Sequence, residues 1–347
     1  MKKWLLLSLV VLTVILLTAG CSKQETPAAD DGVLTIGFVY NTLEHPFYQA
    51  FQRATRKWCQ EYGLTLIDLD GKSDPANMST QIENLVAQRV DGIVYCLVDA
   101  QSAVADIKYA QENNIPIISY AIRHGNGVQV PFVGLDEFAA GQQIGEAAAG
   151  KFQQVFPGVP AKMVILREPR LQATEDRANG FIDAFKKTLP DAVVAGEADG
   201  GALRERAMAA MEDLIQSHPE ANVGYGINGD SALGALAALE GAGRGSIDTF
   251  LLASHDGSEP EILKLIDPKS SLKISIANLP QVLSKACVDT ILDVINGKTS
   301  ATEDVNVFVP ATILDPAVLS IADLQRFLTE EYSSTTDLQA AYDQLTK

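Results

Sequence analysis

The sequence predicts an α/β fold of two doubly wound parallel-sheet lobes, and three observations support this. The chain has 347 residues, enough for two domains at roughly 150 residues each. From Val33 onward, short apolar runs alternate with longer amphipathic segments, which is the pattern of parallel strands covered by helices. Near Pro131–Asp136 a short strand interrupts this rhythm, and the strand–helix unit restarts at Phe138. The interruption predicts a boundary between two similar halves.

The expected strands are the short apolar runs, and the expected helices are the amphipathic segments between them. The strands are Leu34–Val39, Leu64–Leu69, Gly92–Cys96, Ile115–Ser119, Met163–Leu166, Val193–Glu197, Val223–Gly226, Phe250–Ala253 and Leu272–Ile276, with short ones near Pro131–Val133 and Val305–Val309. The helices are Pro46–Tyr62, Pro75–Arg89, Ser102–Asn113, Phe138–Phe152, Thr174–Thr188, Leu203–Ser217, Ser231–Leu239, Pro260–Ile266 and Val282–Ile295, and Ala317–Glu331 is expected as an extra helix. Open parallel sheets bind ligands beyond the carboxyl ends of their strands, so the site should lie on loops after strands.

The N-terminal segment has the pattern of an export signal. Two lysines precede the apolar run Trp4–Leu17, which at about 1.5 Å per residue is short for a bilayer of ~30 Å. Leu17–Ser22 (LTAGCS) then resembles the lipobox of bacterial lipoproteins, in which the cysteine, here Cys21, is lipidated. We therefore expect a lipoprotein signal peptide at residues 1–20 and a tether at 21–32. The alternatives are a plain signal peptide and a retained anchor helix.

Composition excludes several classes of protein. Lys and Arg number 27 against 44 Asp and Glu, and a net charge of −17 repels nucleic acid and anionic lipid.

The other cysteines are Cys59, Cys96 and Cys287. They are odd in number and lack metal-binding spacing, so each is expected to pack in the core as a small apolar side chain.

Two motifs suggest enzymes, but their context argues against both. Gly224–Gly229 (GYGING) matches a dinucleotide-binding fingerprint, yet no acidic residue ends the following strand. Ser254, His255 and Asp256 are adjacent, and neighbouring side chains on an extended segment diverge too far to form a catalytic triad. The four histidines also lack metal-ligand spacing. No catalytic residue, cofactor or metal is expected.

Polar and aromatic residues recur at the ends of the predicted segments. Asn41–Tyr48 follows the first strand, and Pro46 within it can begin a helix. Further along come residues that can bond to a hydroxyl-rich ligand, although each could also be a helix cap or a surface residue: Asp99, Arg123, Arg177, Asn228, Asp230, Asp256 and Asn278.

With these residues the chain resembles, from about Leu34 to Val309, the periplasmic sugar-binding proteins of the ribose-binding type. The resemblance is carried by Thr42–Tyr48 (TLEHPFY), Val90–Ile93 (VDGI), Asn114–Ile118 (NIPII), Glu175–Phe181 (EDRANGF), Asn228–Ala235 (NGDSALGA), His255–Gly257 (HDG) and Ile276–Asn278 (IAN). It implies two lobes joined by a three-segment hinge, with a ligand cleft between them. The lobes would be residues 33–134 plus 279–308 and residues 135–278 plus 309–331, followed by a tail at 332–347.

The resemblance also implies a set of ligand-binding residues. Phe47 and Tyr48 would stack on the sugar beside Asn41 and His45, and the polar partners would be Cys96, Arg123, Arg177, Asn228, Asp256 and Asn278. The chain departs from the family at Ala121–Arg123, where an aspartate is missing and the arginine is offset by one, and at Cys96, where the family commonly has Asn or Asp. Ribose is therefore not assured, and a deoxy-sugar, a polyol or another small polar molecule remains open.

The implied function is that of a monomeric, extracytoplasmic lipoprotein, held at the membrane only through its lipid. It would close on a small polar ligand and deliver it to the membrane subunits of an ABC importer, without catalysing a reaction. The alternative is a sensor that presents the bound ligand to a chemoreceptor or histidine kinase. A DNA-binding regulator of the related fold is disfavoured by the signal peptide and by the lack of a basic helix-turn-helix segment before Leu34.

Overall fold

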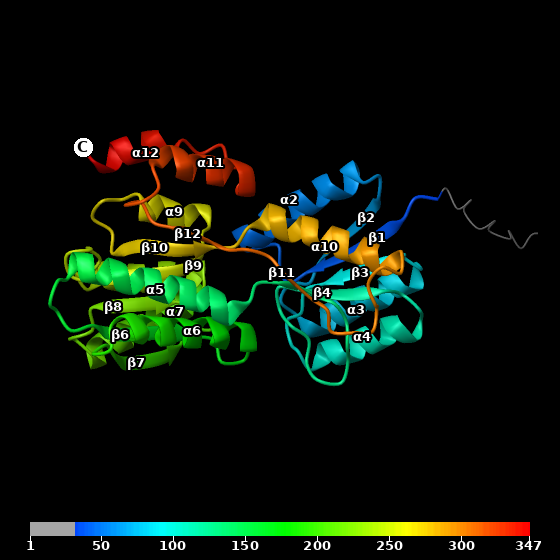
Figure 1. The fold of residues 1–347 in the computed structure, drawn as a ribbon, viewed down its shortest axis with the longest axis horizontal. Helices are drawn as coiled ribbons and strands as arrows, with labels where there is room; N and C mark the ends of the chain where they lie inside the picture. The colour runs from blue at the N-terminus through cyan, green and yellow to red at the C-terminus, as the bar shows by residue number, and fades with distance from the viewer. Residues whose placement is uncertain (1–31) are drawn as a thin grey trace, which may run out of the picture. The chain divides into compact units, whose positions relative to one another are not determined.

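The structure is a computed structural model that describes residues 32–347 and contains two six-stranded sheets (Figure 1). The signal segment and Cys21 lie outside the described residues. The first sheet has the order β11-β5-β4-β3-β1-β2 and is parallel throughout. Its strands are β1 (Thr35–Tyr40), β2 (Thr65–Asp70), β3 (Gly92–Tyr95), β4 (Ile117–Tyr120), β5 (Phe132–Gly134) and β11 (Asn306–Phe308).

The second sheet has the order β12-β10-β9-β8-β6-β7 and is parallel except for its edge strand β12, which runs antiparallel to β10. Its strands are β6 (Lys162–Arg167), β7 (Val193–Asp199), β8 (Val223–Gly226), β9 (Leu251–Asp256), β10 (Leu272–Ala277) and β12 (Thr312–Leu314). The chain passes between the sheets three times: from β5 to the helix that follows it, from β10 to the helix that follows it, and from β11 to β12.

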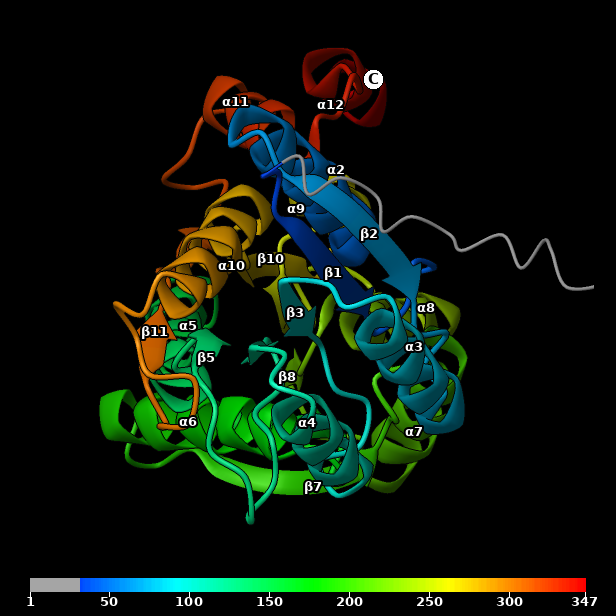
Figure 2. The same cartoon turned by 90° about the vertical axis from the view of Figure 1, so that its right-hand side faces the viewer.

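Helices cover both faces of the first sheet, and together they form the first lobe (Figure 2). Their bounds are α2 (Pro46–Glu61), α3 (Pro75–Ala87), α4 (Ser102–Glu112) and α10 (Pro280–Ile295). Phe38, Phe51 and Ile291 belong to the core between the sheet, α2 and α10, while Val39, Ile82 and Ile107 belong to the core on the α3 and α4 side. The unpaired Cys59, Cys96 and Cys287 are all buried in the core on the α2 and α10 side.

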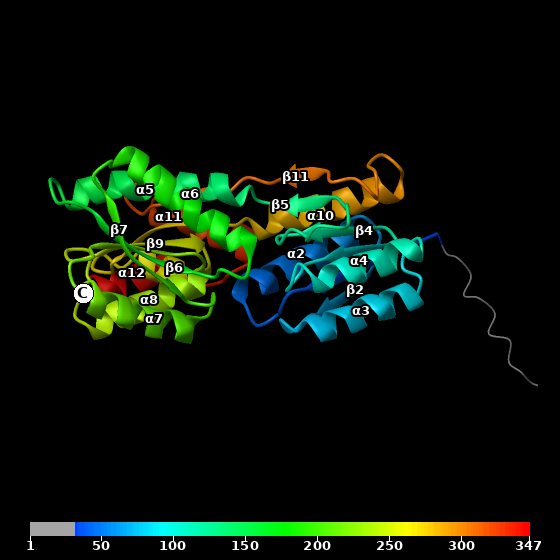
Figure 3. The ribbon, with the colours of Figure 1, turned by 90° about the horizontal axis from the view of Figure 1, so that it is seen from below.

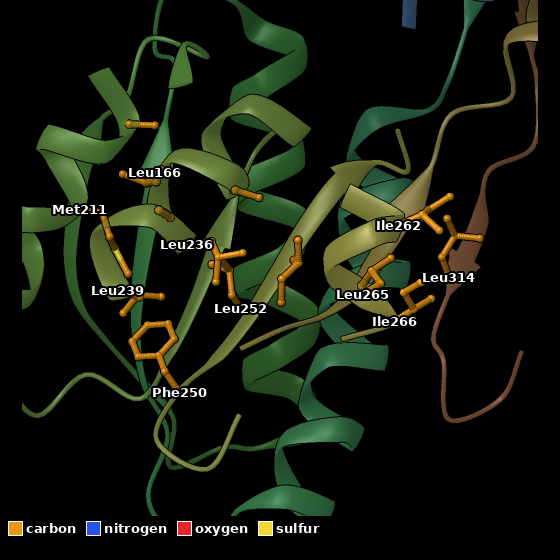
Figure 4. Close-up of a cluster of buried hydrophobic side chains, with 14 of the residues drawn as sticks. Leu166, Met211, Leu236, Leu239, Phe250, Leu252, Ile262, Leu265, Ile266 and Leu314 are labelled. Atoms are coloured by element: carbon orange, nitrogen blue, oxygen red, sulfur yellow. The ribbon is translucent and has the colours of Figure 1, made fainter. Parts of the chain in front are cut away.

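The second lobe has the same layered construction (Figure 3). Its helices are α5 (Glu137–Val155), α6 (Gln172–Thr188), α7 (Arg204–Ser217), α8 (Gly229–Gly241), α9 (Glu259–Leu265), α11 (Ile321–Tyr332) and α12 (Leu338–Leu345). Helices α5 and α6 pack on one face, and α7, α8 and α9 pack on the other, where Leu236, Phe250 and Ile262 are buried together (Figure 4).

The helix starts follow from local sequence. In α2, Pro46 stands in the first turn and the His45 side chain accepts a hydrogen bond from the backbone N–H of Phe47. In α9 and α11 the caps are reciprocal Ser258–Glu261 and Ser320–Asp323 boxes. Gly226, within the fingerprint-like motif, lets α8 approach β8, because a Cβ there would meet the backbone of Ala232.

The predicted fold class is confirmed, and the expected strands and helices are present. Two elements were not expected: the edge strand β12, and α12 within the predicted tail 332–347. Leu338 of α12 is fully buried against the second-lobe core, so this end of the chain is packed. Within residues 32–347, no helix combines the length and the hydropathy that crossing a bilayer demands.

Candidate functional site

A cavity of about 890 Å³ is lined by both lobes at the carboxyl ends of their strands. Its lining includes Asn41 after β1, Asp99 after β3, Glu168 after β6 and Asn278 after β10. Eight of the ten predicted ligand-binding residues line it: Asn41, His45, Phe47, Tyr48, Arg177, Asn228, Asp256 and Asn278. Cys96 and Arg123 do not.

The start of α2 brings aromatic side chains to the first-lobe wall. Phe47 and Tyr48 lie nearly perpendicular with ring centroids 5.1 Å apart, and His45 lies edge-on to Tyr48. Phe47 is almost fully buried and also packs on Phe51, whereas Tyr48 is only half-buried. Both rings are therefore held by packing while they border the cavity.

Cys96 lies behind this wall rather than on it. Its side chain is fully buried, and its Sγ lies 3.4 Å from the Tyr48 hydroxyl. Burial raises the pKa of the thiol to about 12, so it is neutral near pH 7. The structure thus gives Cys96 the role of a support for Tyr48, and it corrects the sequence-based placement on the cavity.

Arg123 is also placed elsewhere. Ala121 has a φ of 58°, and after this turn Ala121 and Ile122 line the cavity. Arg123 instead donates to Asn306 at 2.5 Å and lies over the ring of Phe132 at 4.3 Å. The side chain therefore ties β5 to β11, and the cavity wall at this point is apolar.

On the second-lobe wall, Arg177 of α6 forms a bidentate ion pair with Glu137 of α5, at 2.6 and 2.8 Å. Both side chains are largely buried. The close packing of α5 on α6 makes this geometry possible, because a Cβ at Gly141 would meet the backbone carbonyl of Arg177. Burial raises the pKa of Glu137 and the nearby Arg177 opposes that rise. Nothing in the sequence around Glu137 marks it as a site residue, and the prediction omitted it.

Asp256 ends β9 beside this pair, with its Oδ1 3.8 Å from the Arg177 Nη1. Its Oδ1 accepts a hydrogen bond from the Asn278 amide at 2.9 Å and its Oδ2 accepts one from the Gly229 N–H at 3.1 Å. Burial raises the pKa of Asp256, while His45 and Arg177 lower it. Its φ of 103° is unusual for a residue with a side chain, and such strain persists only where the surroundings fix it.

A second layer of polar groups fixes Asp256 and Asn278 from behind. The buried His255 lies 3.3 Å from both the Asn278 Oδ1 and the Tyr225 hydroxyl, and burial lowers the pKa of its ring. On the other side of β9, Glu261 accepts hydrogen bonds from Ser254, Ser258 and Ser275, and burial, reinforced by the charge of Asp256, raises its pKa to about 7. Asp256 and Asn278 are therefore held in place by other protein groups.

His45 on the first-lobe wall faces two carboxylates of the second-lobe wall. Its Nδ1 accepts the hydrogen bond from the Phe47 N–H, and its Nε2 faces the carboxylates of Asp230 at 3.8 Å and Asp256 at 3.7 Å. Asp230 also pairs with Arg204 at 2.9 Å. Both acidic residues thus lie within reach of a ligand held beside His45.

The two predicted asparagines are partly engaged in structural bonds. Asn228 caps α8 through Ser231 and donates to the carbonyl of Ala202. Asn41 donates to the carbonyl of Leu97 at 3.0 Å and accepts from Ser73 at 2.8 Å. Each keeps only part of its hydrogen-bonding capacity for a ligand.

The structure adds a further pair to the lining that the sequence did not indicate. The Glu168 carboxylate, after β6, is 1% exposed and accepts two hydrogen bonds from the Arg170 side chain, which is 71% exposed, and one from the Arg170 backbone N–H. The position of Glu168 at a strand end could have identified it, although its type alone did not. Among residues 32–347, no cluster of His, Cys, Asp and Glu side chains could hold a metal ion.

Comparisons with known proteins agree with this architecture. The ribose import binding protein of Bacillus subtilis (strain 168) is 25% identical over 295 residues, which cover 85% of this chain and 92% of the relative. The xylitol-binding protein of Mycolicibacterium smegmatis is 26% identical over 65% of this chain and 62% of its own length. Among solved structures, a galactofuranose binding protein superposes with a TM-score of 0.74 at 22% identity, covering 86% of this chain and 99% of that chain.

The myo-inositol binding protein of Caulobacter superposes with a TM-score of 0.71 at 18% identity, covering 84% of this chain and 95% of its own. At this identity the superpositions show the fold alone. The family model described as "periplasmic binding protein domain" matches residues 36–299, which include both sheets except their edge strands β11 and β12. The chain therefore belongs to the periplasmic binding protein domain family, whose members bind substrates rather than transform them.

Proposed function

We propose that this chain is an extracytoplasmic solute-binding protein that captures a monosaccharide or a similar polar small molecule and delivers it to an ABC importer. The observation that carries the proposal is a cavity with aromatic rings on one wall and buried, pre-positioned charged groups on the other. Relatives named for ribose import and for xylitol binding support the same ligand class.

Each wall suits one side of a sugar or polyol. The rings of Phe47 and Tyr48 offer apolar faces to C–H groups. Arg177 can donate to hydroxyl oxygens, and Asp256 can accept from hydroxyl hydrogens. Hydrogen bonds to charged groups contribute about 1.5–3 kcal/mol, more than those between neutral groups, so this wall supplies most of the polar selectivity.

The apolar stretch of the first-lobe wall narrows the ligand class. Val98, Ala121, Ile122 and Leu283 all line the cavity, and at Ala121–Arg123 the chain lacks the aspartate that the family resemblance implies. A ligand hydroxyl facing these side chains would lose its bonds to water without a replacement. We therefore infer that one side of the ligand carries no hydroxyl group. A deoxy-sugar would fit this description better than a pentose that is hydroxylated on every side.

Capture would proceed by closure of the two lobes about the three crossovers. The moving bodies would be residues 33–134 plus 279–308 and residues 135–278 plus 309–331. Asn278 lies at one of these crossovers and bonds to Asp256, so closure and ligand contact would involve the same residue.

A thermal-shift screen of residues 22–347 against pentoses, hexoses, deoxy-sugars, polyols, nucleosides and amino acids tests the proposal. A ligand at 100 times its dissociation constant adds about 2.7 kcal/mol to the free energy of unfolding, which raises Tm by several degrees. A shift with a sugar or polyol, confirmed by calorimetric titration, supports the assignment. An unchanged Tm with every sugar and polyol would contradict it.

The location of the protein is tested separately. We propose that Cys21 carries a lipid and that residues 22–32 tether a monomeric binding domain to the outer face of a membrane. Cys21→Ser should release the protein from the membrane fraction, whereas Cys59→Ser, a matched change in the buried core, should not. Continued sedimentation of Cys21→Ser with membranes would point to an uncleaved anchor helix instead.

A further inference from the structure

The chain continues past β12 into a C-terminal extension (residues 315–347) that lines no part of the cavity. Its helix α11 contacts α9 in the second lobe and also α2 and α10 in the first lobe. Figure 1 shows α11 and α12 beside α9, with the end of α11 towards α2. The extension therefore touches both lobes behind the ligand site.

Tyr332, the last residue of α11, makes the contact nearest to the site. It is 4% exposed, and its hydroxyl donates to the main-chain carbonyl of Asp256 at 3.2 Å. The same carbonyl accepts from the backbone N–H of Asn278 at 3.1 Å. These two donors hold the peptide group of a residue whose φ of 103° needs external support.

The backbone of Tyr332 is joined to the first lobe. Arg53 of α2 donates to the Tyr332 carbonyl at 2.8 Å. The same helix carries Phe47 and Tyr48 at its start, about one and a half turns from Arg53. A single residue outside the cavity is therefore bonded to Asp256 on one wall and to the helix that presents the aromatic rings on the other.

The neighbouring residue strengthens this junction. The Glu331 carboxylate accepts a hydrogen bond from the backbone N–H of Gln281, in the first turn of α10, at 2.9 Å. N–H groups in a first turn have no partner within their own helix, and the positive end of the helix dipole favours a carboxylate there. Residues 331 and 332 are thus attached to both helices that cover one face of the first sheet.

We propose that Tyr332 is a positioning residue for ligand binding: its hydroxyl holds the Asp256 backbone so that the carboxylate faces the cavity, and its carbonyl ties that aspartate to α2. The proposal rests on the proposed function, because it assigns Asp256 to the ligand. Tyr332 does not line the cavity, so its effect would pass through Asp256.

The test is a double-mutant cycle that combines Tyr332→Phe with Asp256→Asn, with Tyr342→Phe on α12 as the matched control. Affinity is measured by calorimetry for the panel sugar or polyol that gives the largest thermal shift. Tyr332→Phe should weaken binding about fivefold, the fold-change of one ordinary hydrogen bond, with Tm within a few degrees of the parent. Tyr342→Phe should leave the affinity unchanged.

The cycle separates positioning from general destabilisation. If Tyr332 acts through Asp256, its loss costs little affinity once Asp256 is already Asn, so the two effects are not additive. Additive effects, or an unchanged affinity in Tyr332→Phe, would overturn the proposal while leaving the proposed function intact.

A ligand-free measurement keeps the inference testable if no panel compound binds and the proposed function fails. Hydrogen–deuterium exchange should become faster in Tyr332→Phe for peptides spanning residues 255–258 and 277–281, and not in Tyr342→Phe. Equal exchange in the two variants would overturn the positioning role on its own.

Discussion

The two walls of the cavity differ in chemistry and in the way their side chains are held. The first-lobe wall includes rings and aliphatic groups fixed by packing, with Phe47 against Phe51 and Tyr48 against Cys96, beside polar side chains such as Asn41. The second-lobe wall is a charged network in which Arg177, Glu137 and Asp256 are buried and held by hydrogen bonds and ion pairs. The first lobe therefore supplies the ring faces of the cavity, and the second lobe supplies its buried ion pair.

The largest effect is expected from breaking the second-lobe network. Arg177→Ala leaves Glu137 buried without its partner, which typically costs about 3–5 kcal/mol of stability. Ligand binding should weaken by more than about 1 kcal/mol, as it should in Asp256→Ala. Denaturant unfolding measures the loss of stability, and calorimetry measures the loss of affinity. The control is Arg206→Ala, which removes an exposed ion pair with Asp199. An unchanged ligand affinity in Arg177→Ala would remove the second-lobe wall from the binding site.

The buried carboxylic acid behind this wall should make stability depend on pH. Burial keeps Glu261 protonated up to about pH 7 in the folded protein, while an exposed glutamate ionises near pH 4.3, so the folded state binds more protons between these values. The contribution of Glu261 to the free energy of unfolding is therefore complete below about pH 4 and is lost as the pH rises through about 7.

Glu261→Gln removes this titration and leaves an amide among the serines. The fall in stability between pH 5 and 8 should be smaller in the variant by an amount on the order of 1–3 kcal/mol, measured by urea unfolding at each pH. The exposed Glu240→Gln provides a comparison. Parallel pH profiles for Glu261→Gln and the parent would show that Glu261 is ionised in the folded state.

A smaller effect is expected on the first-lobe wall. Tyr48→Ala removes a half-buried ring and should weaken binding by about 1 kcal/mol, whereas Tyr48→Phe keeps the ring face and should change binding by less. If Tyr48→Phe proved as damaging as Tyr48→Ala, the hydroxyl beside Cys96 would matter more than the ring.

The smallest effect on ligand binding is expected at Ala121, in the apolar part of the first-lobe wall. Ala121→Asp places an acceptor on the first-lobe wall at a φ of 58°, a conformation that Asp adopts more readily than most residues. The variant should shift preference by about 1 kcal/mol towards ligands with an additional hydroxyl on that side. The ratio of affinities for a deoxy-sugar and its hydroxylated parent, taken before and after the change, measures the shift.

Sequence reasoning located the residues that follow regular elements. Pro46 marks the start of α2, so His45, Phe47 and Tyr48 could be placed together. Asp256 ends β9, and Asn278 directly follows the adjacent strand β10. Arg123 was misplaced because the turn at Ala121 cannot be read from one sequence. Glu137 was missed because its importance depends on the α5–α6 separation, a tertiary property fixed by glycines on both helices.

The C-terminal end shows the same limit. The edge strand β12 has three residues, too few to carry a clear pattern, and it depends on β10 for its pairing. Helix α12 is short, and it packs through Leu338, whose backbone N–H donates to Gln325 of α11 at 2.8 Å. Such elements are specified by neighbours rather than by their own residues.

The way the chain returns to both sheets bears on how the protein folds. Helix α10 and strand β11, which complete the first lobe, and strand β12, which completes the second sheet, are synthesised only after most of the chain. Contacts between distant segments such as β11 and β5 slow folding, because a long loop must close before they form. Neither half can reach its final core while the ribosome still holds the last quarter of the chain. If the chain is exported, as we propose, the segments that complete both cores would be the last to follow it.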